Sequence, residues 1–352
     1  MYWYRLGHVP ELSLAELAAV KLVIEDSDHR YARSKQLIDI QTLGGIAYVA
    51  EDLSGADYVT GIAGFLESTE LKKKFIGVVA NQAFDQTAAL KVFKNSGAKK
   101  IAFIRHEPSI GDVKRSQIVF LAATFENIKY TLRIVEYFNQ DIWAKLEAAL
   151  PVTDMDRGQI NLKLARTMLN FTTSRNILDP FCGTGRNIIA GLDFLVTAGL
   201  SDSDLKAITD AQKNVQFAQD FLKTKVPTQF QTIPAEKVER YNYTAIVSEG
   251  WLGTNFKKTP SVEQARESVQ AVLTSYADCF IQWDHVGIKE VVLSAPYYLN
   301  YPQITEYITN QLRKIAREGG YQVATPGNYD FIHYFRPNNT VGHLIFKLQK
   351  IS

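Results

Sequence analysis

Short apolar runs alternate with longer amphipathic stretches along the first half of the chain, an alternation typical of an α/β fold. The run Tyr2–Leu6 predicts a strand, and Ser13 with Glu16 three residues later predicts the capped start of a helix. Further on, the same reasoning predicts a helix over 87–94 and strands over 75–79, 101–105, 118–123 and 130–135. The first half is therefore expected to form an α/β module of modest size.

The second half repeats the alternation more regularly, as a parallel sheet with crossover helices does. Apolar runs predict strands at 177–178, 196–200, 230–233, 245–247 and 291–294, with helices near 187–195, 204–223, 261–280 and 303–317. The last two runs, 331–335 and 344–348, are joined by a polar segment that contains Pro337 and Gly342, and they predict a hairpin. We expect a mostly parallel sheet that ends in an antiparallel hairpin.

A polar connector after Pro151 separates the two halves. A chain of 352 residues is too long for one ordinary core, so two or three domains are expected. We place an N-terminal α/β domain at 1–68, a second module at 69–140, a linker at 141–158 and a larger α/β domain at 159–352.

Several classes of protein are disfavoured by composition. The chain has no apolar run of ~18 residues for a membrane span, and its start lacks the layout of a signal peptide. Cys182 and Cys279 lie far apart and give neither a disulfide framework nor a metal spacing, so both are read as structural. The histidines are scattered, and His333 and His343 in the hairpin are also read as structural. A cytoplasmic protein without a metal is expected.

Charge is distributed unevenly although the net charge is only +2. Residues 71–133 carry 12 Lys and Arg against 4 Asp and Glu, whereas residues 1–70 carry 5 against 11. A basic segment of this kind favours a polyanion partner, and a solvated lysine-rich surface is the alternative. The candidate phosphate contacts are Lys72, Lys73, Lys74, Lys99, Lys100, Arg105, Lys114 and Arg115.

The segment Asp179–Gly185 lies between the predicted strand at 177–178 and the helix that follows it. Gly183 and Gly185 allow positive φ and a close approach of a ligand to the backbone. The carboxylate of Asp179 makes a phosphate less suitable here than a cationic or hydroxyl-rich ligand. The alternative is a turn that needs glycine only for its own geometry.

Polar residues also follow the second and fourth strands of this half, at the sheet edge where open α/β folds bind ligands. Asp202 follows the glycine turn by about 20 residues, a spacing suited to binding ribose hydroxyls, while Asp204 could simply cap a helix. Ser248, Glu249 and Trp251 emerge together after the fourth strand, where an aromatic ring could stack on a base. The alternatives are a solvated Glu249 and a core position for Trp251.

These residues resemble a known family. Asp-Pro-Phe-Cys-Gly-Thr-Gly at 179–185 is similar to motif I of S-adenosylmethionine-dependent RNA methyltransferases with a THUMP domain, above all the tRNA guanosine N2-methyltransferases of the position-10 type. The resemblance extends over nearly the whole chain, through 6–17, 43–45, 116–117, 156–158, 160–165 and 341–343.

The resemblance implies a Rossmann-like class I methyltransferase domain at 159–352 and a THUMP-like RNA-binding module at 69–140. It implies S-adenosylmethionine as cofactor, tRNA as partner and a cytoplasmic setting, and it leaves any activating protein subunit unidentified. The cofactor-binding residues would be Asp179, Phe181, Gly183, Gly185, Asp202, Ser203 and Glu236. Ser248 and Trp251 would take the first and fourth positions of the family's catalytic tetrad, Asp/Asn/Ser-Pro-Pro-aromatic, with Glu249 as a further catalytic residue.

Two departures from the family pattern affect the chemistry. Both prolines of the tetrad are replaced, by Glu249 and Gly250, so Glu249 could itself be the hydrogen-bond acceptor or base, and Gly250 predicts a less firmly fixed loop. The acidic residue expected after the third strand is absent, and Glu236 could take its place. The alternatives are an RNA-binding protein whose methyltransferase fold is inactive, and a methyltransferase acting on DNA amines.

Overall fold

The computed structural model describes residues 1–53, 62, 65, 75–79, 86–95, 100–116, 118–153, 160–239, 242–336 and 339–351. The chain divides into two compact units. The N-terminal unit comprises Met1–Pro10, Leu22–Gln41 and Ile46–Ile142, and the C-terminal unit comprises Glu11–Lys21, Thr42–Gly45 and Trp143–Ser352. The four-part division expected from the sequence stays a prediction.

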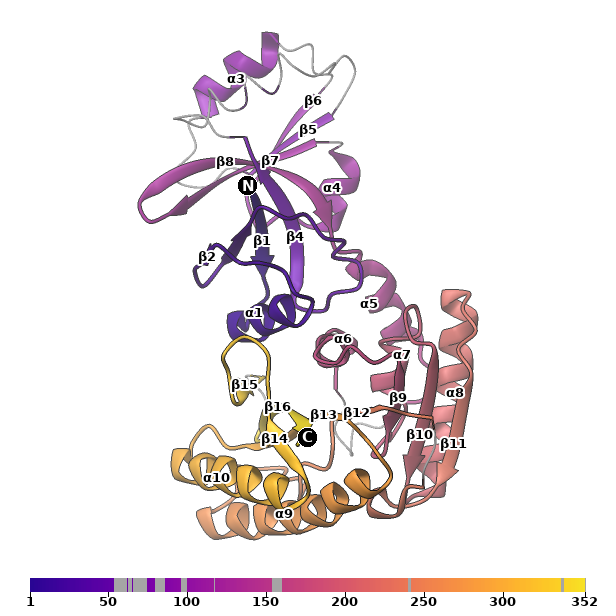
Figure 1. Ribbon diagram of the computed structural model, residues 1–352. Coiled ribbons are helices and arrows are strands. Elements are labelled where there is room, and N and C mark those ends of the chain that lie inside the picture. The colour runs from indigo at the N-terminus through magenta and orange to yellow at the C-terminus, as the bar shows by residue number, and fades with distance from the viewer. Residues whose placement is uncertain are drawn as a thin grey trace. The chain divides into compact units, whose positions relative to one another are not determined.

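The N-terminal unit is built on a mixed sheet whose described strands run in the order β2-β3-β1-β4-β8-β7-β5-β6. Their bounds are Tyr2–Leu6 for β1, Asp26–Ser27 for β2, Tyr31–Ser34 for β3, Ile46–Asp52 for β4, Phe75–Val79 for β5, Lys100–Ile104 for β6, Ile118–Phe125 for β7 and Ile128–Tyr137 for β8. Strand β5 is parallel to β6 and β7, and the other pairs are antiparallel. Helices α3 (Gln86–Asn95) and α4 (Ile110–Arg115) belong to the same unit (Figure 1).

The first helix, α1 (Pro10–Ala19), corrects one prediction, because Ser13 and Glu16 lie inside it and not at its start. Ser13 donates a hydrogen bond to the carbonyl of Gly45 at 2.8 Å. The fully buried carboxylate of Glu16 accepts from the backbone N–H groups of Gly44 and Gly45 at 2.8 and 2.7 Å. The predicted capping box is therefore wrong, since Glu16 satisfies the backbone of a glycine turn instead of its own helix. These residues all belong to the C-terminal unit.

The C-terminal unit contains a second sheet, whose described strands run in the order β11-β10-β9-β12-β13-β16-β14, with β15 also paired to β16. Strands β9 to β13 are mutually parallel where they pair, and β16 is antiparallel to its neighbours. The bounds are Asn176–Asp179 for β9, Thr197–Asp202 for β10, Thr228–Thr232 for β11, Ala245–Val247 for β12, Glu290–Tyr297 for β13, Tyr321–Val323 for β14, Ile332–Tyr334 for β15 and Gly342–Lys350 for β16. The predicted parallel sheet with a terminal hairpin is confirmed.

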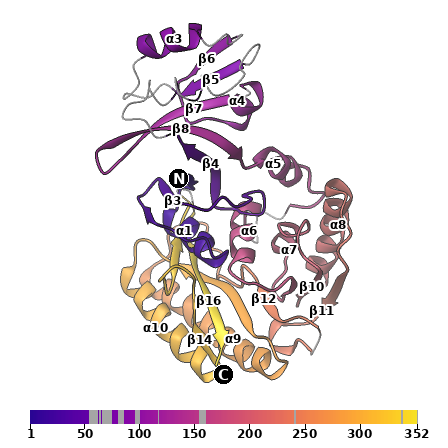
Figure 2. The same ribbon diagram turned by 45° about the horizontal axis from the view of Figure 1, so that its top comes forward.

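Helices cover this second sheet, and α9 (Val262–His285) and α10 (Pro302–Glu318) run side by side in both views (Figures 1 and 2). The other described elements are α5 (Gln140–Ala149), α6 (Leu162–Asn170), α7 (Arg186–Ile189), α8 (Leu205–Leu222) and the 3-10 turn η1 (Ala235–Lys237). Helix α7 is shorter than predicted, because the chain after it closes into turns such as Gly191 N–H to Ile188 carbonyl.

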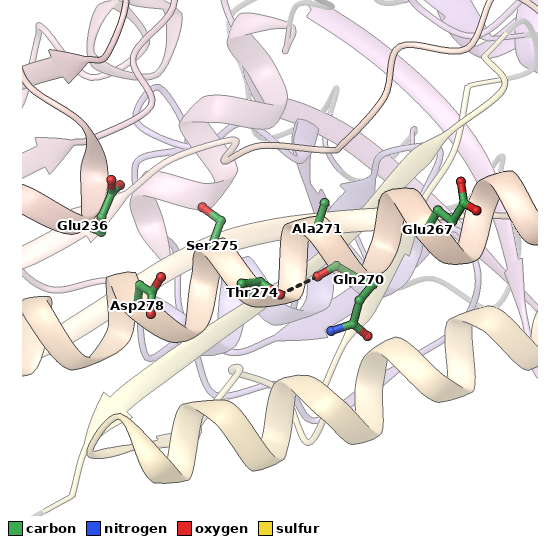
Figure 3. A pocket seen from close by; sticks show the side chains of 7 residues that line it. All are labelled: Glu236, Glu267, Gln270, Ala271, Thr274, Ser275 and Asp278. Atoms are coloured by element: carbon green, nitrogen blue, oxygen red, sulfur yellow. Dashed lines mark hydrogen bonds between the residues drawn. The ribbon is translucent and has the colours of Figure 1, made fainter.

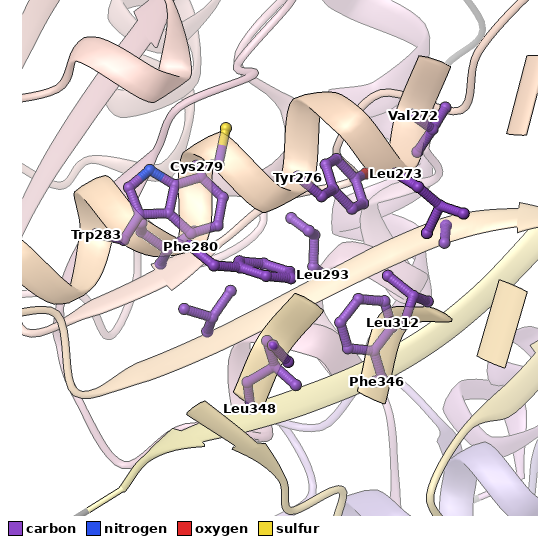
Figure 4. Packing of buried hydrophobic residues seen from close by; sticks show 14 of the residues in the cluster. Val272, Leu273, Tyr276, Cys279, Phe280, Trp283, Leu293, Leu312, Phe346 and Leu348 are labelled. Carbon is purple, nitrogen blue, oxygen red and sulfur yellow. The ribbon is translucent and has the colours of Figure 1, made fainter. Parts of the chain in front are cut away.

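The core of the C-terminal unit lies between α9, α10 and the sheet (Figure 4). Tyr276, Phe280 and Trp283 of α9 are fully buried and pack with Leu293 of β13 and Phe346 of β16. Burying each such aromatic ring stabilises the fold by roughly 1.5–3 kcal/mol. This core includes residues of β12 and β13, and the candidate site lies at the end of β12. No helix in the described part of the chain is both long and apolar enough to cross a membrane.

Candidate active site

The glycine turn after β9 leaves open space beside its backbone. Gly183 and Gly185 have φ of +50° and +84°, a region that favours glycine. A Cβ on Gly183 would meet no atom within 4 Å, whereas one on Gly185 would approach Val215 of α8 at 3.2 Å. Gly185 therefore serves the packing of the helices, and Gly183 leaves space beside the backbone.

Asp179 lies behind this turn and is fully buried. Its Oδ1 accepts hydrogen bonds from Ser248 Oγ at 2.6 Å and from the Phe181 N–H at 3.2 Å, and its Oδ2 accepts from Asn187 Nδ2 at 3.0 Å. Burial raises the pKa of Asp179 to about 6, although these donors act in the opposite direction. Asp179 thus ties the turn to the loop after β12.

A pocket of about 950 Å³ opens in front of the turn. Of the residues singled out in the sequence, Phe181, Gly183, Asp202, Ser203, Glu236, Glu249 and Trp251 line it. Asp179, Gly185 and Ser248 are not among its lining residues and support the wall from behind. The parallel sheet accordingly brings the ends of β9, β10 and β12 to one site, as expected for this fold.

Asp202, at the end of β10, presents a partly exposed carboxylate to the pocket. Its Oδ2 accepts from the Gly183 N–H at 3.1 Å and its Oδ1 from the Asp204 N–H at 3.0 Å. Each carboxylate oxygen has a further lone pair for a ligand hydroxyl. Asp204 also caps α8 through a 2.7 Å bond from the Lys206 N–H, so the helix-cap alternative holds for Asp204.

Asn187 carries the clearest sign of a missing partner at this site. It lines the pocket, and its side-chain oxygen is buried without a hydrogen-bond partner among the described residues, while its Nδ2 is bonded to Asp179. A buried acceptor of this kind is costly unless a ligand donor reaches it. An ammonium group placed beside Gly183 would supply such a donor.

Two hydroxyl groups contact the loop after β12. Ser248 is fully buried, and its hydroxyl donates to Asp179 and accepts from the Gly250 N–H at 3.1 Å. Gly250 has φ +73°, and a Cβ there would lie 2.1 Å from Tyr276 Oη. The same tyrosine hydroxyl contacts the Trp251 carbonyl at 3.2 Å. Ser248 and Tyr276 thus contact the loop at Gly250 and Trp251, and the less firmly fixed loop expected from Gly250 stays a prediction.

Trp251 is 41% exposed, so the loop position predicted for it is confirmed and the core alternative is excluded. Trp251 is one of the residues that line the pocket. Phe181 lines the pocket too, but its ring packs against Tyr276 and Trp283 at centroid distances of 6.1 and 6.4 Å.

Glu249 has its carboxylate in the pocket wall, and its side chain is 20% exposed. Oε2 accepts from the Ile160 N–H at 3.2 Å, and Oε1 lies 3.7 Å from His343 Nε2. Burial raises the pKa of Glu249 to about 7, with a further contribution from Asp179. The alternative of a freely solvated Glu249 is excluded.

His343 was read from the sequence as structural, and the structure shows instead that it lines the pocket. Burial lowers its pKa to about 4, so the ring is neutral near pH 7. In the sequence, the one signal for this position of His343 is its place in the terminal hairpin. No residue near His343 in the sequence points to the site. His333, in contrast, is exposed and stacks on Tyr297 at 4.5 Å.

Glu236 lies at the junction of the pocket with a shallow groove along α9. The groove is lined by Glu236, Glu267, Gln270, Ala271, Thr274, Ser275 and Asp278, and Figure 3 shows Glu236 across from the helix. Glu236 therefore lies in the wall of the main pocket, and its role in place of the acidic residue absent after the third strand stays a prediction.

The candidate phosphate contacts lie in the N-terminal unit and are only partly described. Lys72, Lys73, Lys74 and Lys99 fall outside the described residues. Lys100 and Arg105 are exposed at the two ends of β6. Lys114 and Arg115 are exposed too, and they form ion pairs with Asp141 at 3.1 Å and with Asp112 at 2.8 Å. The Lys114–Asp141 pair is exposed and therefore weak, whereas Asp112, the partner of Arg115, is buried.

The sheet order, the strand-end pocket and the terminal hairpin define a Rossmann-like α/β fold, the fold class predicted from the sequence. TrmN from Thermus thermophilus is similar to this chain, with a TM-score of 0.52 and 12% identity over 99% of both chains. A "possible methylase" from Clostridium difficile 630 gives a TM-score of 0.48 at 10% identity, over 100% of this chain and 98% of that one.

A third solved structure covers a smaller share of the chain. Magnesium protoporphyrin IX methyltransferase from Synechocystis PCC 6803, with bound SAH, has a TM-score of 0.38 and 16% identity over 60% of this chain and 93% of that one. Neither a family model nor a curated protein matches the sequence. At these identities the similarity to TrmN establishes the fold.

Proposed function

We propose that this protein is an S-adenosylmethionine-dependent methyltransferase that methylates an exocyclic amine in tRNA, with guanosine N2 as the target. The observation that carries the proposal is one pocket that joins the open glycine turn at Gly183, the carboxylate of Asp202 and the loop Glu249–Trp251. The first two suit a nucleoside cofactor, and the third suits a base.

The cofactor half of the pocket fits S-adenosylmethionine in three respects. Asp202 has free lone pairs for the two ribose hydroxyls, and Asn187 Oδ1 lacks a partner that the methionine ammonium can provide. The space beside Gly183 admits the chain between them. Bound there, S-adenosylmethionine supplies an electrophilic methyl group on its sulfonium.

In the part of the pocket proposed for the substrate, the hydrogen-bond acceptor is Glu249 and not Ser248. The hydroxyl proton of Ser248 is committed to Asp179, and its oxygen already accepts from Gly250, so it has little capacity left for a substrate. Glu249 points into the pocket beside Trp251, whose ring can stack on a base. A carboxylate can accept from both N1–H and N2–H of guanine, which favours this base over one with a single donor.

The partner is inferred from the charge of one segment of the N-terminal unit. A segment with net charge +8 (12 against 4) over 71–133 favours a polyanion, and the resemblance of this segment to THUMP modules favours tRNA. We infer that this unit binds tRNA while the C-terminal unit performs the chemistry in the cytoplasm.

The test is transfer of labelled methyl groups from S-adenosylmethionine to tRNA, followed by mass spectrometry of the nucleosides. Trp251→Ala is expected to lower kcat/KM by roughly 5- to 150-fold, since stacking of a base is worth ~1–3 kcal/mol. Ile281→Ala is the matched control, because Ile281 is 59% exposed on α9 and does not line the pocket. Cofactor binding without transfer to any tRNA would favour the alternative of an inactive RNA-binding protein. Transfer to DNA would favour the alternative of a methyltransferase that acts on DNA amines.

A further inference from the structure

His343 and Ser294 lie behind Glu249 and belong to two adjacent strands. Ser294 of β13 pairs with Ile345 of β16, so His343 is its diagonal neighbour on the same face of the sheet. Ser294 is fully buried, and His343 is 6% exposed. The proposed chemistry assigns neither residue a task.

The hydrogen bonds fix which nitrogen of His343 carries the proton. Ser294 Oγ lies 2.6 Å from the Glu249 carbonyl and 3.3 Å from His343 Nδ1. A carbonyl can only accept, so the single hydroxyl proton goes to the shorter bond. Ser294 can then only accept from Nδ1, which must be the protonated nitrogen of the neutral ring.

This tautomer leaves a lone pair on Nε2, and that nitrogen faces Glu249 Oε1 at 3.7 Å. Two acceptors in a buried wall repel one another unless a proton lies between them. The other groups around Glu249 are Arg186, Arg336, Asp179 and the Ile160 N–H. The two arginines favour the carboxylate, and Asp179 disfavours it.

We propose that His343, held as the Nδ1–H tautomer by Ser294, is a positioning residue that pairs with Glu249 to accept the proton released from the substrate amine. The inference rests on the proposed function. As the new C–N bond forms from the nitrogen lone pair, the methyl–sulfur bond breaks and its electron pair stays on sulfur. The nitrogen then loses one proton to Glu249, and the resulting acid donates to His343 Nε2 until the proton leaves to solvent.

The tautomer can be tested without substrate or cofactor by 15N NMR of the imidazole nitrogens in the full-length protein. The His343 signals are assigned by their loss in His343→Gln. A protonated Nδ1 and a bare Nε2 near pH 7 are expected. A protonated Nε2 would overturn the inference, because that nitrogen would then donate to Glu249.

The proton-accepting role is tested by the pH dependence of kcat/KM for methyl transfer. His343→Gln can turn an amide N–H₂ group toward Glu249, and Ser294→Ala lets His343 take the tautomer that donates from Nε2 to Glu249. Each donor lowers the pKa of Glu249, so both variants should move the acid limb of the pH profile to lower pH by about one unit. His333→Gln is the matched control from the same hairpin and should leave the limb in place.

The outcomes separate the two ideas. An unchanged acid limb in both His343→Gln and Ser294→Ala, in proteins that fold and transfer methyl groups, would refute the role of His343. A wild-type protein that methylates no tRNA would refute the proposed function, whereas the NMR experiment would still decide the tautomer.

Discussion

Replacing Glu249 by glutamine should make the stability of the C-terminal unit depend less on pH. The pKa of Glu249 is raised from its ordinary 4.5 to about 7, chiefly by burial. The folded protein therefore holds this proton more tightly than the unfolded chain. The stabilisation is complete below the unfolded pKa of 4.5 and is lost as the pH rises through about 7.

The size of the effect follows from that interval of about 2.5 pH units, since one unit corresponds to about 1.4 kcal/mol and the total is about 3 kcal/mol. Glu249→Gln removes the ionisation but keeps an acceptor for the Ile160 N–H. The free energy of unfolding of the variant minus that of wild type should thus rise by up to about 3 kcal/mol between about pH 5 and about pH 8.

Urea unfolding followed by tryptophan fluorescence measures this difference, because Trp143, Trp251 and Trp283 of the 4 tryptophans lie in the C-terminal unit. Glu267→Gln provides the control, as it removes an equal charge from an exposed position on α9. A difference that stays constant with pH for Glu249→Gln, or that falls as the pH rises, would refute the electrostatic account of the pocket.

Two further predictions concern glycines. Gly183→Ala and Gly287→Ala both place a side chain at positive φ in open space, and each should cost about 1 kcal/mol of stability. Only Gly183→Ala should weaken S-adenosylmethionine binding in calorimetry. Equal binding by both variants would contradict a cofactor site at the Gly183 turn. Gly250→Ala should cost at least about 2 kcal/mol because its Cβ would lie 2.1 Å from Tyr276 Oη, and Tyr276→Phe should recover part of that loss in a double-mutant cycle, whereas strictly additive losses would argue against the contact.

The glycine turn and the ends of the neighbouring strands could be predicted from the sequence because their signals are local. A strand, a glycine pair and a helix start follow one another within 179–186, and parallel strands bring their carboxyl ends to one edge. Asp202 and Trp251 were placed in the pocket by the same rule.

The pairing of Glu249 with His343 could not be predicted in this way, because it depends on the register of β16 against β13. The same limit applies to Glu16. Its spacing from Ser13 matches a capping box, but a glycine turn distant in the sequence takes up the carboxylate. Local spacing identifies which groups need a partner, and the tertiary fold decides which partner each group finds.

The unusual sequence of the loop after β12 is internally consistent. Ser248 donates its one hydroxyl proton to Asp179 and accepts from the Gly250 N–H, while the next residue, Glu249, lines the pocket and offers a further acceptor. The positive φ of Gly250 turns the chain so that the Glu249 carbonyl meets Ser294 while the carboxylate lines the pocket. Proline at 250 would forbid this φ and displace Glu249. Gly250 and the position of Glu249 in the pocket wall therefore depend on one another in this structure.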